Sequence, residues 1–258
     1  MTTSTTVPDF GTLAWAHAGG GRMTRREKLA ELARSASVIA PLMTARAATG
    51  LRLPQRSMVS LNIDGVTFPD SAVARDAEAE CREHASEMMY NHSVRCYVWA
   101  LMLAEHRGLK PDLEMLYVAS LLHDLTLEDD YRDYAPMACF AARGAILAND
   151  WAAERGWGRD QRTVLADAVS LHLNSRVHPK HGPEAELLQA AAGVETIGLH
   201  YRRLDPESVA RVLDRYPYLD MGRVGLPRFV GESHPHTRAR FLMRIGFGTL
   251  VRTSPLAK

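Results

Sequence analysis

Along most of the chain, apolar residues recur every three to four positions, the spacing that places them on one face of a helix. The segments with this pattern are separated by residues that cap or break helices. The pattern predicts helices over residues 25–34, 71–89, 91–108, 113–123, 136–155, 160–172, 184–201, from 205 onward, and 236–251. The segment 113–123 is apolar on most sides and is therefore predicted to lie at the centre of the protein. The sequence thus predicts an all-α fold.

The helical pattern also predicts how the chain is divided. Residues 70–258 are expected to form one helical domain, and residues 1–69 a partly irregular extension packed on it. Within that extension, residues 58–68 are compatible with a short pair of strands that turns at Asp64-Gly65. A stretch rich in Pro and Gly, residues 217–235, has the composition of a lid loop.

The charge balance excludes some partners. The formal net charge is +1, and acidic residues are interleaved with the many arginines. Nucleic acid and anionic membranes are therefore not expected partners. The first residues lack the basic and apolar segments of a signal peptide, and no apolar run is long enough to cross a bilayer. We expect a cytoplasmic protein with a small-molecule substrate and leave homo-oligomer formation open.

The cysteines predict neither disulfides nor a thiolate zinc site. There are three, Cys81, Cys96 and Cys139, and no CxxC motif occurs. Cys96 sits in an apolar helical run and is interpreted as a buried, reduced thiol. This interpretation fits the reducing conditions of the cytoplasm.

A histidine–aspartate pair closes the most apolar of the predicted helices. His123 and Asp124 lie in the run LLHDL, and an aspartate at a buried helix end is costly unless something pairs with it. A metal ion is one such partner, since imidazole nitrogen and carboxylate oxygen are common ligands of transition metals. His92 opens the preceding predicted helix. Because a short connection places the start of one helix beside the end of the next, His92 and His123 are expected to meet.

The histidine–aspartate pair alone is weak evidence in a chain with 11 histidines, but the order of several motifs is more specific. The run that begins NHSVR at residue 91 and ends LLHDLTL at residue 127 resembles the HD-domain superfamily, and closely its cyanamide-hydratase-like branch. The likeness continues in FAARGA (140–145), AVSLHLN (168–174) and AAGVETIGLHY (191–201). It covers roughly residues 68–215 and implies an HD-domain helical bundle.

The resemblance implies a metal site. The ligand set of the superfamily, written H…HD…D, matches His92, His123 and Asp124, and its last position falls on Glu195. Glutamate keeps the carboxylate and reaches one methylene further, so we expect Glu195 to remain a ligand. The implied cofactor is one divalent transition metal ion, with zinc favoured and Fe, Mn, Ni or Co as alternatives.

The resemblance also implies that metal-activated water attacks a small substrate. The superfamily suggests a phosphoester, and the nearer branch suggests a nitrile such as cyanamide. The expected catalytic residues are Asp124, His172 as a substrate contact or proton shuttle, and Arg95. Arg95 either binds an anionic group of the substrate or pairs with Glu114 or Asp124. The scarcity of cationic residues near the motifs favours a weakly charged substrate.

Two other functions stay open. A di-iron oxygenase of the HD type requires a second metal ion, with His172 and either His178 or His181 as ligands. A degenerate HD module would bind a ligand without turnover, and the change from Asp to Glu195 is the one feature that favours it. The number and kind of metal ions per chain distinguish the three functions.

Overall fold

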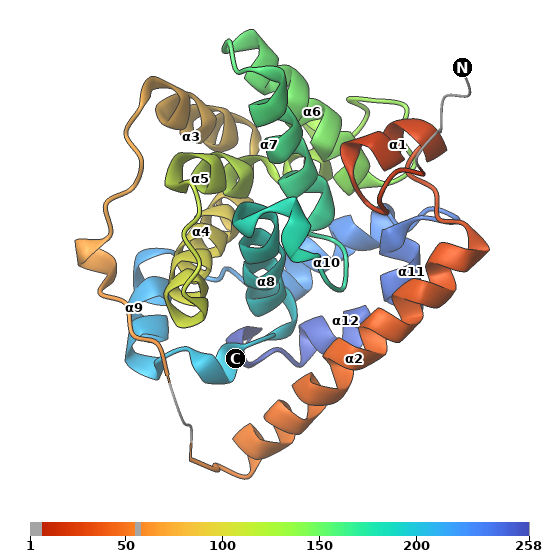
Figure 1. The fold of residues 1–258 in the computed structure, drawn as a ribbon. Helices are drawn as coiled ribbons and strands as arrows, with labels where there is room; N and C mark the ends of the chain where they lie inside the picture. Colours follow the sequence, from red (N-terminus) through yellow and green to blue (C-terminus); the bar gives the residue numbers. More distant parts are fainter. Residues whose placement is uncertain (1–6, 55–57, 258) are drawn as a thin grey trace.

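The computed structural model describes residues 7–54 and 58–257, which fold into helices joined by short connections (Figure 1). The α-helices of the described residues are α1 (Leu13–Gly19), α2 (Arg25–Gly50), α3 (Ala72–His84), α4 (Glu87–Arg107), α5 (Leu113–Leu122), α6 (Phe140–Glu154), α7 (Arg159–Leu171), α8 (Pro183–Ile197), α9 (Pro206–Arg215), α10 (Met221–Gly231), α11 (Arg238–Arg244) and α12 (Phe247–Arg252). Short 3-10 helices are η1 (Ile63–Gly65), η2 (Leu125–Leu127), η3 (Asp129–Tyr131), η4 (Pro179–His181), η5 (Tyr201–Arg203) and η6 (Pro255–Ala257). The predicted all-α fold is confirmed.

Helices α4, α5, α7 and α8 form the centre of the protein. Helix α5 is buried from Met115 to Leu122 and contacts α3, α4, α7 and α8, as its apolar character on most sides predicts. Helix α4 packs against α5 and, more extensively, against α8. Helix α6 packs against α7 on the outside of this core (Figure 1). Among the described residues, no helix has the length and apolar character needed to cross a membrane.

The connection between α4 and α5 brings the metal-ligand candidates together. Helix α4 ends at Arg107 and is capped by Gly108, which adopts the left-handed conformation with φ 65°. Asp112 then caps α5 by accepting a hydrogen bond from Met115 N. At its other end, α4 begins at Glu87, earlier than residue 91, where the pattern placed it. His92 therefore lies in the second turn of α4 and not at its start.

Three predicted segments differ from the structure. Residues 58–68 form no strand pair: Asn62 accepts a hydrogen bond from Asp64 N and starts η1, and the one bridge of the region joins Val59 to Leu204. The helix predicted over 236–251 is two helices, because Gly246 adopts φ 96° between α11 and α12. The predicted lid loop of 217–235 contains helix α10.

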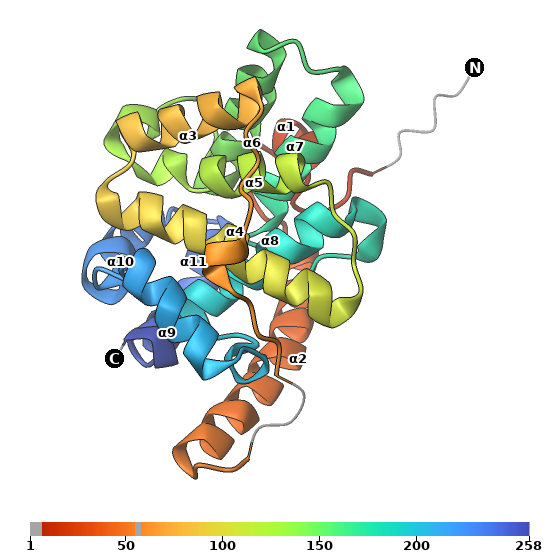
Figure 2. The ribbon, with the colours of Figure 1, turned by 90° about the vertical axis from the view of Figure 1, so that its left-hand side faces the viewer.

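The N-terminal extension packs on the last helices of the chain. Helix α2 runs along one edge of the molecule (Figures 1 and 2), and its Arg46 donates a hydrogen bond to the carbonyl oxygen of Leu250 in α12. A second hydrophobic cluster joins Trp15 and Met23 to Phe140, Phe229 and Ala239. Helices α1 and α2 therefore lie with helices α10 to α12 beside the helical core, and the cavity described below is lined by α2, α10 and α12 together with that core.

Candidate metal centre

Three helix segments bring four polar side chains to one buried point. His92 projects from α4, His123 directly follows the last residue of α5, and His172 directly follows the last residue of α7. Asp124 comes next after His123 and precedes η2. All four side chains are buried, although such groups are normally exposed unless they have partners.

The distances within this group match those of a metal site. His92 Nε2 lies 3.2 Å from His123 Nε2, and Asp124 Oδ2 lies 3.4 Å from each of them. In a tetrahedral site with bonds of about 2.0–2.1 Å, neighbouring ligand atoms lie about 3.3–3.4 Å apart. The three atoms therefore form a triangle of the size that one metal ion requires. The predicted meeting of His92 and His123 is observed.

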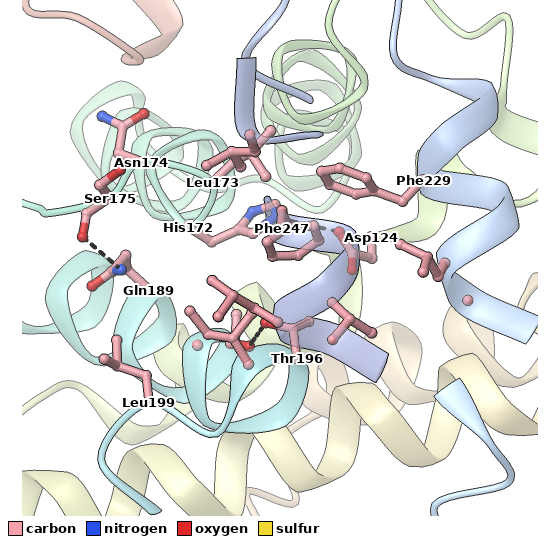
Figure 3. A pocket seen from close by; sticks show the side chains of 18 of the residues that line it. Asp124, His172, Leu173, Asn174, Ser175, Gln189, Thr196, Leu199, Phe229 and Phe247 are labelled. Atoms are coloured by element: carbon pink, nitrogen blue, oxygen red, sulfur yellow. Dashed lines mark hydrogen bonds and ion pairs between the residues drawn. The ribbon is translucent and has the colours of Figure 1, made fainter. Parts of the chain in front are cut away.

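His172 lies on the other side of the Asp124 carboxylate. Its Nε2 atom is 3.3 Å from Asp124 Oδ1, while Asp124 Oδ2 faces His92 and His123 (Figure 3). His123, Asp124 and His172 are thus also close enough to share an ion. The carboxylate of Asp124 stands between two sets of imidazole nitrogens.

The backbone fixes which nitrogen of each imidazole carries the proton. Nδ1 of His123 lies 2.8 Å from the carbonyl oxygen of Ser120, and Nδ1 of His172 contacts the carbonyl oxygen of Val169. Because a carbonyl only accepts, each Nδ1 donates its proton and each Nε2 keeps a lone pair. The lone pairs point towards Asp124, an arrangement that suits a cation better than a proton network.

Burial reinforces this arrangement. It lowers the pKa of His123 to about 3, so this imidazole is neutral at physiological pH. Burial opposes the charge of Asp124, but His123 and the other imidazoles around it hold the pKa of that carboxyl well below its usual value. Oδ1 of Asp124 is buried without a hydrogen-bond partner, and Nε2 of His172 lies 3.3 Å from it. Imidazole nitrogens around an ionised carboxylate form the donor set of a divalent transition metal.

Comparison with known proteins identifies the domain that contains this group. A family model described as HD domain matches residues 89–216. The chain belongs to the HD-domain superfamily. The family is mostly metal-dependent hydrolases, and the matched region contains every metal-ligand candidate of this chain. A search of curated proteins found no match to the chain.

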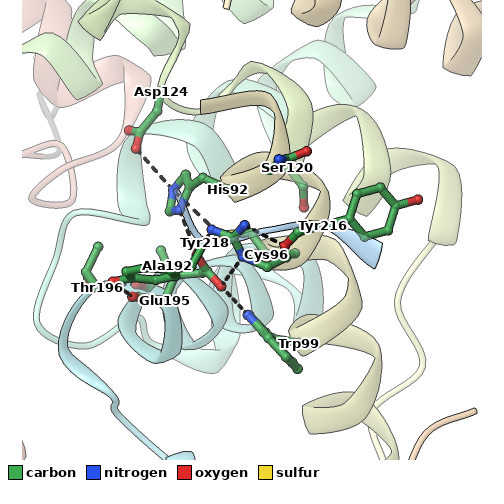
Figure 4. Close-up of polar contacts among 12 residues, drawn as sticks. His92, Cys96, Trp99, Ser120, Asp124, Ala192, Glu195, Thr196, Tyr216 and Tyr218 are labelled. Carbon is green, nitrogen blue, oxygen red and sulfur yellow. Dashed lines mark hydrogen bonds and ion pairs between the residues drawn. The ribbon is translucent and has the colours of Figure 1, made fainter. Parts of the chain in front are cut away.

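Glu195 is the residue that the sequence resemblance places at the last ligand position, but its side chain lies behind the His92 ring, away from His123. Its Oε2 atom lies 3.2 Å from His92 Nδ1, the ring nitrogen opposite the one that faces His123 (Figure 4). Trp99 Nε1 donates to Oε1 of the same carboxylate at 2.5 Å. The structure therefore brings Glu195 to a metal-ligand candidate and not to the triangle of ligand atoms.

Arg95 holds Glu195 in this position. Its guanidinium donates from Nε and Nη2 to the two carboxylate oxygens, at 2.9 and 2.7 Å. Nη1 donates to the carbonyl oxygens of Tyr216 and Pro217. Burial favours the neutral form of Glu195, but Arg95 and His92 together lower the pKa of this carboxyl to about 2. The partner of Arg95 is thus Glu195, and neither Glu114 nor Asp124, which the sequence suggested.

Cys96 is a neighbour of the group His92, His123, Asp124 and His172, here named the HD centre, that the sequence analysis missed. Its Sγ atom lies 3.7 Å from His92 Nε2, and it forms with His92 and His123 another buried group of metal-site size. The available signal was its position four residues after His92, on the same helix face. Burial raises the pKa of the Cys96 thiol, so Asp124 is the better anionic ligand beside the two histidines.

His178 and His181 do not join the HD centre. His178 is exposed and caps η4 by accepting from Lys180 N, and His181 Nε2 lies 3.8 Å from Asp9 at a separate surface hollow. The second ligand that the oxygenase alternative requires beside His172 is therefore supplied by neither of them.

A cavity of about 120 Å³ opens beside the HD centre, with His92, Asp124 and His172 on its wall (Figure 3). Apolar side chains make up most of the remaining wall. They come from α2 (Val38, Ile39), α4 (Met89), α6 (Phe140), α8 (Ala192, Ile197), α10 (Met221, Leu226, Phe229) and α12 (Phe247, Leu250, Val251), together with Leu127, Leu173, Leu199, Leu242 and Ile245. The metal-ligand candidates thus lie at the wall of an apolar chamber.

Proposed function

We propose that this HD domain is a metal-dependent hydrolase or hydratase that adds water to a small substrate. His92, His123 and Asp124 would hold one divalent transition metal, for which zinc is the best match to two imidazole nitrogens and a carboxylate oxygen. Such an ion, when bound, lowers the pKa of water towards neutrality and polarises the substrate. The single observation that carries the proposal is the convergence of the Nε2 atoms of His92 and His123 on Asp124.

The remaining residues of the site divide into two roles. Asp124 and His172 face the cavity, so they are placed to contact the substrate. Nε2 of His172 has a free lone pair and takes a proton from the attacking water, and it returns that proton to the product. Glu195 and Arg95 act through His92, as positioning residues that fix the direction of its Nε2 atom.

Resemblance to the cyanamide-hydratase-like branch supports hydration of a nitrile. In that reaction the water oxygen bonds to the nitrile carbon, one carbon–nitrogen π bond breaks and the nitrogen takes up one proton, which gives an imidic acid. Transfer of the hydroxyl proton to the nitrogen then breaks the second carbon–nitrogen π bond and forms the carbonyl of the amide. Phosphoester hydrolysis, the common reaction of the superfamily, requires cationic groups around the phosphate. The cavity wall offers no lysine or arginine among the described residues, which favours hydration.

Metal analysis tests the proposal. We expect about one zinc ion per chain by plasma mass spectrometry after reconstitution. His123→Ala should remove the ion and the activity, whereas the exposed His234→Ala serves as the control. About two iron ions per chain would contradict the proposal and favour the di-iron oxygenase. A chain that takes up no metal after reconstitution would replace it by the binding module without turnover.

A further inference from the structure

We infer that the substrate of this site is an uncharged molecule with a compact apolar body about the size of a benzene ring. The inference rests on the proposed function, because it takes the wall at Asp124 and His172 as the reactive end of the cavity. Four features of the described residues that line the cavity support it.

The first feature is size. The cavity measures about 120 Å³. An apolar protein cavity of about 150 Å³ accommodates benzene, so this one accepts a single ring or a short branched chain.

The second feature is the aromatic and aliphatic lining. The rings of Phe140 and Phe229 pack edge to face with centroids 5.6 Å apart. Phe247 lies next to Phe229 on the same wall, with ring centroids 4.8 Å apart. Leu226 and Met89 lie on the same cavity surface. Binding is favoured when this wall removes the apolar surface of a ligand from water. A charged ligand would lose its hydration here without a compensating partner.

The third feature is charge. Among the described residues that line the cavity, none is Lys or Arg, and Asp124 is the one acidic side chain. Two buried arginines of the protein are already paired, Arg95 with Glu195 and Arg143 with Glu232. A phosphoester would therefore bring negative charge towards Asp124 with no protein cation to compensate it.

The fourth feature is that polar side chains on the wall already have partners. Ser35 Oγ donates to the carbonyl of Glu31 at 2.8 Å, and Thr196 Oγ1 donates to the carbonyl of Ala192 at 2.7 Å. Gln189 Nε2 donates to the backbone at Ser175. These donors already have hydrogen-bond acceptors within the protein, so they do not require polar groups on the body of the substrate.

Much of this wall lies outside the part of the chain that matches the HD family. The family match ends at residue 216 and begins at residue 89, whereas Val38, Ile39, Leu226, Phe229 and Phe247 lie beyond it on both sides. The HD region supplies the metal-ligand candidates, and the flanking helices α2, α10 and α12 select the substrate. An HD domain with other flanking helices would accept other molecules.

Three ligands with the same ring test the inference. Benzonitrile and phenyl acetate are neutral, and phenyl phosphate is anionic. Titration calorimetry with the zinc-reconstituted full chain should show that the neutral ligands bind at least about tenfold more tightly than phenyl phosphate. Phenyl phosphate that binds as tightly as benzonitrile overturns the inference.

Binding of benzonitrile to a variant without the metal site tests this inference separately from the proposed function. Benzonitrile should bind to His123→Ala nearly as well as to wild type, because the apolar wall is unchanged. If rings bind but the wild type takes up no metal and turns nothing over, the proposed function fails and the inference stands. Loss of benzonitrile binding in a folded His123→Ala protein overturns the inference.

Two wall variants should act in opposite directions. Ala192→Leu adds bulk to the cavity and should weaken benzonitrile binding at least about tenfold with normal metal content, whereas Ala79→Leu, on the exposed face of α3, should not. Leu226→Ala enlarges the cavity and should allow the larger 1-naphthonitrile to bind. If Ala192→Leu does not fold, Leu226→Ala decides, and failure to gain the larger ligand overturns the inference.

Discussion

Arg95 and Glu195 form a two-pronged ion pair in the interior, with Nε 2.9 Å from one carboxylate oxygen and Nη2 2.7 Å from the other. Both side chains are 0% exposed. The same carboxylate contacts Nδ1 of His92 at 3.2 Å, so the pair sets the direction in which His92 points its other nitrogen. A carboxylate behind a ligand histidine in this way raises its basicity and fixes its orientation.

Glu195→Gln should destabilise the protein and weaken its metal site without abolishing it. The variant leaves the Arg95 charge buried and uncompensated, which costs about 3–5 kcal/mol in the free energy of unfolding. The affinity for zinc should fall by about 10–100-fold, because His92 loses its orienting partner. Urea denaturation of the metal-free protein and a competitive zinc titration measure the two effects.

Glu186→Gln is the matched control, since Glu186 pairs with Arg107 at 2.8 Å but both side chains are 24% exposed. Its loss of the ion pair should change the free energy of unfolding by less than about 1 kcal/mol. A folded Glu195→Gln protein that binds no zinc at all would contradict the positioning role and make Glu195 a metal ligand.

The connection from α4 to α5 was predictable because it is set by the residues that cap the two helices. Gly108 ends one helix and Asp112 caps the next, and a connection this short makes the helices neighbours. From this alone, His92 and His123 were expected to meet. By contrast, apolar periodicity continues past Gly246, so it could not show that the chain turns there.

The place of the Glu195 side chain was not predictable from its motif position. A motif gives the order of residues in a family, whereas the direction of this side chain depends on Arg95 and Trp99. Arg95 lies 100 positions earlier in the chain, and it reaches Glu195 only because α4 packs along α8. The cavity wall could not be predicted from the sequence for the same reason, because it combines helix α2 with helices α10 and α12.

His172→Gln should lower turnover and leave the metal in place. Gln keeps a polar group at the cavity wall but does not carry a proton, so turnover should fall by about 10²–10⁴-fold. Metal content by plasma mass spectrometry and turnover of a nitrile are measured on the same preparation. The exposed His178→Gln is the control. If zinc content falls together with turnover, His172 is a ligand and not a proton carrier.

His200 should make stability depend on pH. Burial, followed by the positive charge of Arg107, lowers its pKa from 6.5 to about 4. As the pH falls below 6.5 the unfolded chain binds this proton first, so the free energy of unfolding decreases until about pH 4. Between pH 7 and pH 5 the decrease amounts to about 2 kcal/mol.

Urea denaturation at both pH values checks this prediction. His200→Asn removes the titrating group, and Asn tolerates the left-handed conformation that His200 adopts with φ 61°. The variant should lose less stability between pH 7 and pH 5 than the wild type, by the same 2 kcal/mol or so. Equal losses in the two proteins would assign the pH dependence to other groups.

Gly198 and Gly108 should respond differently to alanine, although both end a helix with φ 65°. At Gly108 an added Cβ meets nothing within 4 Å, so Gly108→Ala costs only the left-handed conformation, about 1–2 kcal/mol. At Gly198 the Cβ would lie 2.4 Å from Pro255 Cδ, and displacing that residue adds about 1–3 kcal/mol. Urea midpoints of the two variants measure the difference. Equal losses would mean that Pro255 does not pack on the end of α8, the helix that carries Glu195.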